Sequence, residues 1–164
     1  MNFKKLLAAS SLAGMTLLAA AGPAQAAQLS GSGLHWFQGQ TPSVTNNGSS
    51  VEASGQVAGA GTSIVANLDV HYTFPVTCFN PGKDIGPVPG QSGSGTASGS
   101  QTVQALHGNA SFDITVPVPT SNTPPPHACP NGKWTAVVGP PTVTSATVTV
   151  NSSNGGTLTY TQTF

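Results

Sequence analysis

Apolar and polar residues alternate strictly along residues 64–74, which is the clearest pattern in the chain. One set of alternate positions, from Ile64 to Phe74, is apolar, and the intervening set is polar apart from Val65. Because successive side chains of a β-strand point to opposite faces, this pattern predicts a strand with one face in a core and the other in solvent. Pro75 follows directly and predicts the end of the strand.

Weaker forms of this alternation predict the other strands, and segments rich in Gly, Ser and Pro separate them. We therefore expect an all-β fold with about eight short strands, packed as a single antiparallel β-sandwich of the immunoglobulin-like or jelly-roll type. The topology stays open, because immunoglobulin domains carry a tryptophan between their two cysteines, whereas Trp36 precedes both cysteines and Trp134 follows both. The predicted strands lie at residues 34–38, 51–59, 64–74, 96–106, 111–118, 134–138, 142–151 and 157–164.

Matching apolar positions predicts a hairpin between residues 96–106 and 111–118. A four-residue loop at residues 107–110 would place Val103 opposite Ile114, so that apolar side chains share one face.

The closing hairpin is predicted in the same way. A five-residue loop at residues 152–156 buries the valines of the preceding strand and turns the threonines outward. A loop with an even number of residues would instead place Val148 and Val150 on the same face as Thr157 and Thr159. We prefer the five-residue loop, which places these residues on one face: Val148, Val150, Leu158, Tyr160 and Phe164.

The first 26 residues have the features of a cleaved signal peptide. Lys4 and Lys5 precede a mostly apolar run, and a small-x-small site ends at Ala26. Residues 27–164 then form a secreted β-sandwich domain, located outside the cell or in the cell envelope. No later apolar run approaches the roughly 20 residues of a membrane helix, so we expect no membrane insertion after signal cleavage.

Charged residues make up only 5% of the chain, and none is arginine. This is far below the usual share of about a quarter. Nucleic-acid binding needs a basic footprint, so we expect no nucleic-acid partner. Beyond residue 26 the charged residues are Glu52, Asp69, Lys83, Asp84, Asp113 and Lys133.

Two cysteines in an exported protein predict one disulfide, between Cys78 and Cys129. The alternative, a pair of reactive thiols or metal ligands, would need a depressed thiol pKa and basic neighbours. Similar sequences, CFNPGK and CPNGK, begin at the two cysteines. Asn, Pro and Gly favour turns, so these sequences predict two chain reversals stapled together.

Residues capable of catalysis are few and scattered, so we expect no enzymatic activity. Asp69 and Asp113 could face each other on one sheet surface, as could any two polar-face residues. Asp69 and His71 would point the same way along a strand, but a metal site usually needs three or more ligands. We therefore expect neither a metal nor a cofactor.

Aromatic residues are the candidate ligand-binding residues. Trp36, Phe37 and Trp134 could provide sugar-stacking surfaces, because aromatic rings combine an apolar face with polar edges. Trp134 also suits the core beside the disulfide. The threonines of the closing hairpin could form a recognition face, although threonine is common on exposed strands.

The cysteine loops resemble those of a loose class of small exported bacterial proteins. The shared features are a Cys-x-Asn-Pro-Gly loop that runs to Pro-Gly-Gln, here residues 78–82 and 89–91, and a later Cys-Pro-x-Gly loop, here residues 129–132. Lys83 stands where that pattern has a second glycine. The resemblance implies a disulfide-pinned β-sandwich and carries no known activity.

These observations favour a non-catalytic extracellular or cell-surface module with a structural or binding role. Its partner would be a polysaccharide or another surface protein. Two alternatives stay open: a carbohydrate-binding protein, and a self-assembling surface or filament subunit. The second follows from the scarcity of charged residues, which normally protect sheet edges from pairing.

Overall fold

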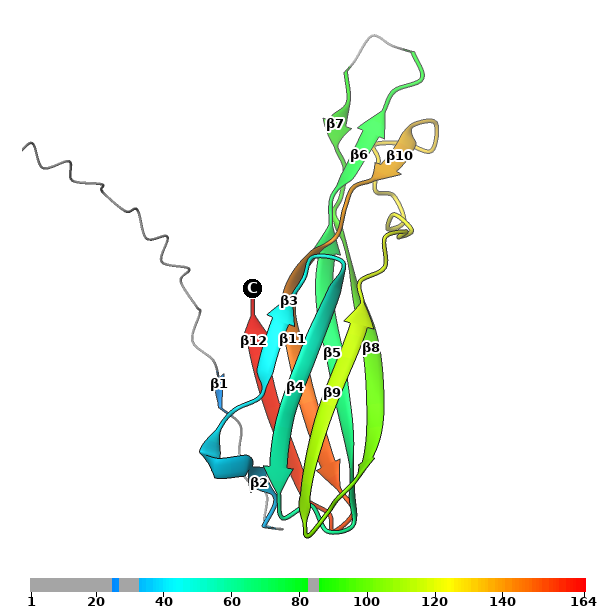
Figure 1. Cartoon of the computed structure of the whole chain (residues 1–164). Helices are drawn as coiled ribbons and strands as arrows, with labels where there is room; N and C mark the ends of the chain where they lie inside the picture. The colour runs from blue at the N-terminus through cyan, green and yellow to red at the C-terminus, as the bar shows by residue number, and fades with distance from the viewer. Residues whose placement is uncertain (1–24, 27–32, 83–85) are drawn as a thin grey trace, which may run out of the picture.

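The computed structural model describes residues 25–26, 33–82 and 86–164 of the chain. These residues form an elongated all-β molecule in which antiparallel sheets pack together and a narrower tip projects from one end (Figure 1). The predicted signal peptide lies outside the described residues, except for the short strand β1 (Gln25–Ala26). Lys83 and Asp84 also lie outside them.

The first sheet contains four long strands from distant parts of the sequence. Its two central strands are β5 (Ser63–Phe74) and β11 (Thr142–Ser152). β12 (Thr157–Thr163) flanks β11, and β8 (Gly93–Gln104) flanks β5. The two-residue β1 pairs with the outer side of β12.

The second sheet is built around β4 (Ser50–Ala58), with β9 (Asn109–Pro117) on one side. β2 (His35–Trp36) and β3 (Ser43–Asn46) pair with its other side. A 3-10 turn, η1 (Phe37–Gly39), follows β2. The predicted strand at residues 34–38 is therefore only partly right.

The chain passes between the two sheets in the order of an immunoglobulin-like sandwich. β3 and β4 form a hairpin in the second sheet, and β5 and β8 lie side by side in the first. β9 returns to the second sheet, and β11 and β12 complete the first. β8 thus takes the place of the extra strand that variable-type immunoglobulin domains add beside their central strands.

The core lies between the two sheets, and the alternation predicted for residues 64–74 is confirmed. The apolar positions of β5 from Ile64 to Phe74 are buried, whereas Val65 is exposed. β5 ends immediately before Pro75, as predicted. Facing side chains from the second sheet complete the core: Val51, Ala53, Val57, Phe112, Ile114 and Val116.

The closing hairpin also has the predicted register. Val148 lies opposite Tyr160, and Val150 lies opposite Leu158. These four side chains are buried, because the five-residue loop keeps both apolar sets on the inner face. Phe164 departs from the prediction: it follows the last residue of β12 and is 48% exposed.

The predicted hairpin between residues 96–106 and 111–118 is wrong. β8 pairs with β5 along its whole length, and β9 pairs with β4. Val103, expected opposite Ile114, lies opposite Ile64. Apolar matching could not select the partner, because the first half of β8 carries mainly glycine and alanine on its inner face.

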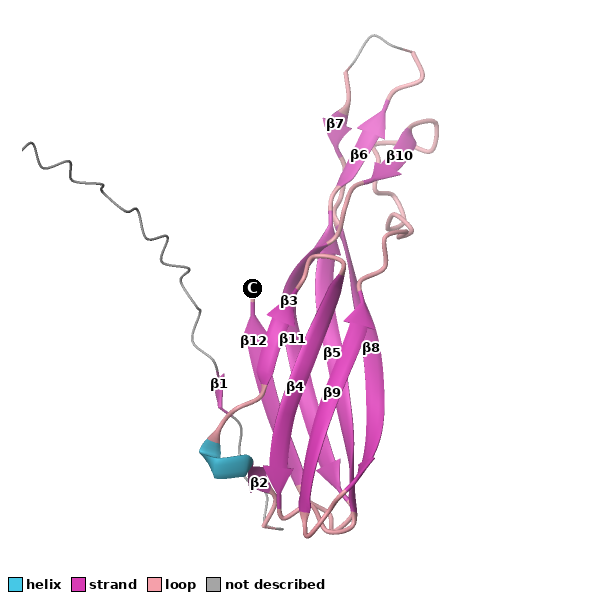
Figure 2. Ribbon diagram, in the orientation of Figure 1, coloured by secondary structure: helices cyan, strands magenta, loops and turns pink. Residues whose placement is uncertain are grey.

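A small third sheet forms the projecting tip (Figure 2). It contains β7 (Val88–Pro89), β6 (Val76–Phe79) and β10 (Thr135–Val138), with β6 in the middle. β6 continues β5 after a single proline, and β10 leads into β11 through two prolines. We use "the tip" for this sheet together with the loop at residues 118–134, the tip loop.

Candidate binding site at the tip

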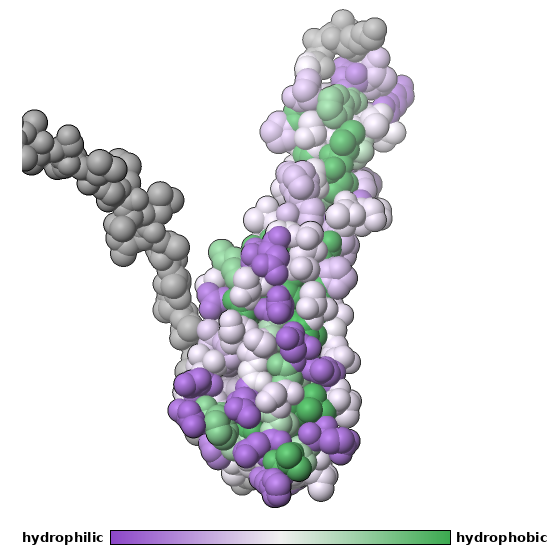
Figure 3. All heavy atoms as spheres, in the orientation of Figure 1, coloured by the Kyte–Doolittle hydropathy of each residue, from purple (hydrophilic) through white to green (hydrophobic). Residues whose placement is uncertain are grey.

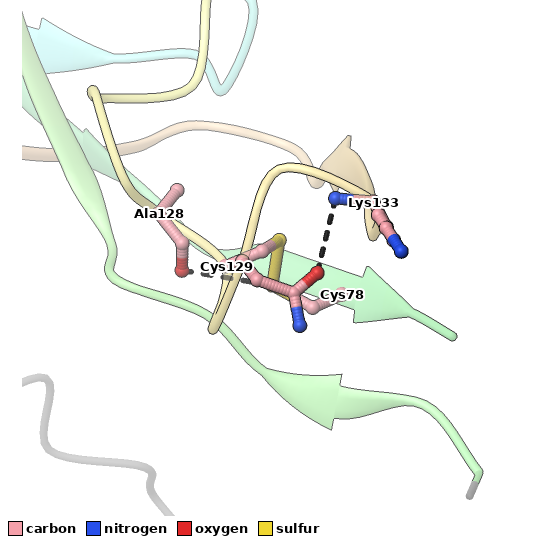
Figure 4. The surroundings of a disulfide bond; sticks show 5 residues. Cys78, Ala128, Cys129 and Lys133 are labelled. Carbon is pink, nitrogen blue, oxygen red and sulfur yellow. Dashed lines mark hydrogen bonds between the residues drawn. A yellow bond between two sulfur atoms is a disulfide. The ribbon is translucent and has the colours of Figure 1, made fainter. Parts of the chain in front are cut away.

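A disulfide between Cys78 and Cys129 fastens the tip loop to β6, as predicted (Figure 4). The two Cα atoms lie 5.6 Å apart. The Cys78 sulfur also lies 3.6 Å from the carbonyl oxygen of Ala128. A disulfide sulfur has no proton to donate, so this is a packing contact. Cys78 is fully buried, and the crosslink therefore forms the centre of the tip.

Further contacts hold the tip loop against the chain that follows β7. The N–H of Gln91 donates a hydrogen bond of 2.9 Å to the carbonyl oxygen of Ala128. A Cβ atom at Gly90 would lie 2.7 Å from the Cys78 sulfur and 2.8 Å from the Ala128 oxygen. The Pro-Gly-Gln sequence thus needs glycine in the middle, because a side chain there would press on the disulfide.

The two similar sequences after the cysteines form the same kind of turn. The Asn80 side-chain oxygen accepts a 3.1 Å hydrogen bond from the N–H of Gly82. The Asn131 side-chain oxygen accepts a 3.0 Å hydrogen bond from the N–H of Lys133 (Figure 4). In both turns asparagine bonds to the backbone two residues ahead. Turn formation therefore explains the repetition.

A hollow of about 210 Å³ lies between the tip loop and β10. Half-buried Trp134 forms an aromatic part of its wall, and His127 and Asn131 contribute polar atoms. Within the described part of the chain, no Asp, Glu, Lys or Arg lines it. The rest of the wall consists of Pro124, Pro125, Ala128, Cys129, Gly132 and Ala136.

Phe79 and Val137 form an exposed apolar pair on the outer face of the tip sheet. They lie diagonally across β6 and β10, because Phe79 is opposite Thr135 and Val137 is opposite Thr77. Phe79 is 42% exposed and Val137 is 48% exposed. Figure 3 shows hydrophobic side chains at the tip. This pair was not among the residues predicted from the sequence, although a buried Cys78 implies that the next side chain points outward.

Trp36 and Phe37 lie at the end of the molecule opposite the tip, far from Trp134 (Figure 1). The Trp36 ring packs against Phe112, with 6.4 Å between the ring centroids. Phe37 lines a separate hollow of about 280 Å³, whose other lining residues include Gln40 and Gln56. The three candidate aromatic residues therefore do not form one site.

Asp69 and Asp113 lie on the outer faces of different sheets, so the expectation that they could share a surface is wrong. The error follows from the pairing of β8 and β9, which places β5 and β9 in separate sheets. Asp69 accepts a 2.6 Å hydrogen bond from the Ser98 hydroxyl. The His71 Nδ1 atom lies 3.1 Å from the Thr96 hydroxyl. Each side chain thus has its own partner on β8.

Among the described residues, no group of three or more His, Cys, Asp or Glu side chains could hold a metal ion. No helix in the same part of the chain is long and apolar enough to span a membrane. Searches of protein-family models, curated proteins and solved structures found no match for this chain.

Proposed function

We propose that this protein is a non-catalytic, exported binding module that holds its ligand in the tip hollow beside Trp134. The observation that carries the proposal is the fixed position of this hollow. A disulfide at Cys129 and a backbone hydrogen bond at Ala128 anchor its wall. A wall that is ordered before binding loses little conformational entropy when a ligand arrives.

The lining of the hollow favours an uncharged ligand with an apolar face. The Trp134 ring offers a stacking surface, and the His127 ring and Asn131 amide supply hydrogen-bonding groups. A sugar ring has matching features, with an apolar face and hydroxyl groups around its edge. We therefore propose a polysaccharide as the ligand, in preference to another surface protein.

Export is supported by two independent observations. Disulfides persist mainly in oxidising compartments outside the cytosol, and Cys78 and Cys129 are joined. The composition of residues 1–26 is that of a signal peptide. The binding module would therefore act in the cell envelope or the surrounding medium.

Binding to a panel of soluble polysaccharides and insoluble cell-wall material tests this function. Isothermal titration calorimetry reports the soluble ligands, and cosedimentation reports the insoluble ones. Trp134→Ala should weaken binding at least about tenfold, which corresponds to about 1.4 kcal/mol. Trp36→Ala is the matched control, because it removes the other tryptophan at the far end of the molecule, and it should leave binding unchanged.

Four results would contradict the proposal. Equal binding by wild type and Trp134→Ala would exclude the tip hollow, and loss of binding only in Trp36→Ala would move the site to the other end. Failure to bind any member of the panel would exclude the polysaccharide assignment. Hydrolysis of a ligand that disappears in Asp69→Asn or Asp113→Asn would show an enzyme.

A further inference from the structure

β8 is the open edge of the first sheet (Figure 1). In the described part of the chain, β5 pairs with one side of β8 and no strand pairs with the other. The N–H of Ala105 donates a 2.8 Å hydrogen bond to Thr62, which continues the ladder between β8 and β5. Because bonded and non-bonded pairs alternate, the odd-numbered residues of β8 bond to β5. The even-numbered residues turn their N–H and C=O groups toward the open edge.

This edge lacks the features that usually prevent strand pairing. β8 is 12 residues long, and its register with β5 runs without a bulge. Residues 93–104 contain no charged residue and no proline. Long edges without charge, proline or bulge are the ones that pair with other strands. The outward side chains are short or uncharged: Ser94, Thr96, Ser98, Ser100, Thr102 and Gln104.

The other edges of the molecule are less suited to pairing. β12 pairs with β1 at Tyr160 and Thr161, and once the predicted signal peptide is cleaved it would be a shorter edge than β8, with 7 residues against 12. β9 carries Asp113 and ends at Pro117, which are both edge-protecting residues. β3 and β10 contain only four residues each. β8 is therefore the edge at which pairing meets the least opposition.

An antiparallel copy of β8 fits this edge in one symmetric register. A two-fold axis at Gly99 places Ser98 opposite the partner's Ser100, and Thr96 opposite the partner's Thr102. All of these are even-numbered positions, so both strands offer free N–H and C=O groups at every such pair. Hydroxyl-bearing residues also pair favourably across antiparallel strands. On the inner face the axis passes through glycine, which has no side chain to collide.

We propose that two copies of this chain pair through β8 and form a closed two-fold dimer with one continuous sheet. β8 begins at the tip, and the paired strands run antiparallel, so the two tips point in opposite directions. The dimer would then bridge two ligand sites. This bridging role rests on the proposed function, whereas the pairing of β8 does not.

Sedimentation velocity over a rising protein concentration tests the dimer. Wild type should shift toward twice the monomer mass, whereas Ser100→Lys should stay monomeric over the same range. The substitution places two like charges near the two-fold axis and adds a residue type that protects natural edges. Wild type that stays monomeric throughout would overturn the proposal.

Asn67→Lys is the matched control. Asn67 lies directly opposite Ser100 in the ladder, on the same outer face but on a central strand. It should leave the dimer intact. A dimer disrupted equally by Asn67→Lys would indicate pairing through the sheet face. A dimer disrupted by Thr159→Lys but not by Ser100→Lys would indicate pairing through β12. Either result would overturn the proposal.

Cysteine crosslinking tests the register independently. Residues at a hydrogen-bonded antiparallel pair have Cα atoms about 5.5 Å apart, which suits a disulfide. An equimolar mixture of Ser98→Cys and Ser100→Cys should form crosslinked heterodimers under mild oxidation. Each variant alone should crosslink several-fold less, because identical positions lie diagonally across the axis. Equal yields from all three samples would contradict the proposed register.

Discussion

The rings of Tyr72 and Phe74 lie across the backbone of β8, each directly opposite a glycine. Tyr72 faces Gly95, and Phe74 faces Gly93. A Cβ atom at Gly95 would lie 2.4 Å from the Tyr72 hydroxyl oxygen, and one at Gly93 would lie 2.2 Å from the Phe74 ring. At the scale of residues, these glycines leave the space in which the aromatic rings enter the core.

Gly95→Ala should therefore lower the free energy of unfolding by about 1–3 kcal/mol, the usual cost of overpacking. The Tyr72 ring would have to move, and its hydroxyl would lose the 3.1 Å hydrogen bond to Asn122. Urea denaturation at low protein concentration measures the change. Gly132→Ala is the control, because a Cβ atom there meets nothing within 4 Å. Equal losses from both substitutions would contradict this packing argument.

Some features of the tip can be predicted from individual residues, and others cannot. The pairing of Cys78 with Cys129 follows from a count of two cysteines in a chain that is predicted to be exported. The hollow beside Trp134 depends on where the tip loop lies. Contacts between Gln91 and Ala128, which are distant in sequence, fix that position. No local pattern encodes such a contact.

At the scale of elements, apolar alternation predicts a strand's partner only where both strands have it. β11 and β12 each have apolar side chains on one face. A shift of one residue in their pairing would expose one of these apolar sets, so their register could be predicted from the sequence. β8 presents glycines at positions 93 and 95, which leave room for the rings of Phe74 and Tyr72 on β5. Two predictions failed because the partner of β8 was not identified. They are the hairpin between residues 96–106 and 111–118, and the expectation that Asp69 and Asp113 share a surface.

The two faces of β11 give a direct test of this register. Val148 is fully buried, and the adjacent Thr149 lies on the outer face opposite Thr159. Val148→Thr should lower the free energy of unfolding by about 1–3 kcal/mol, because it buries a hydroxyl without a partner. Thr149→Val should change it by less than about 0.5 kcal/mol. A larger loss from Thr149→Val, measured by urea denaturation, would contradict the observed face assignment.

At the scale of the whole molecule, cleavage of the predicted signal peptide would determine whether the β12 edge of the first sheet is covered. Cleavage after Ala26 would remove β1 and its pairs with β12. We predict that intact mass spectrometry of the exported protein will show a chain beginning at Ala27. Ala26→Arg should block processing, because the site requires a small residue. An exported chain that retains residues 1–26 would contradict the predicted cleavage.

The chain runs directly from the sandwich into the tip between β5 and β6, and back between β10 and β11. The disulfide should therefore stabilise the tip and the sandwich as one unit. The cysteines are separated by 51 residues, and this span contains β8 and β9. Crosslinking so long a span restricts the unfolded chain, and the entropy model gives about 4 kcal/mol.

The double variant Cys78→Ala, Cys129→Ala should therefore unfold at a much lower urea concentration, with a loss approaching this value. Wild type in reductant should match the variant, because both remove the same crosslink. Reductant should not change the variant itself, which controls for other effects of the reagent. A variant as stable as the oxidised wild type would show that the noncovalent contacts of Ala128 and Gly90 suffice to hold the tip loop.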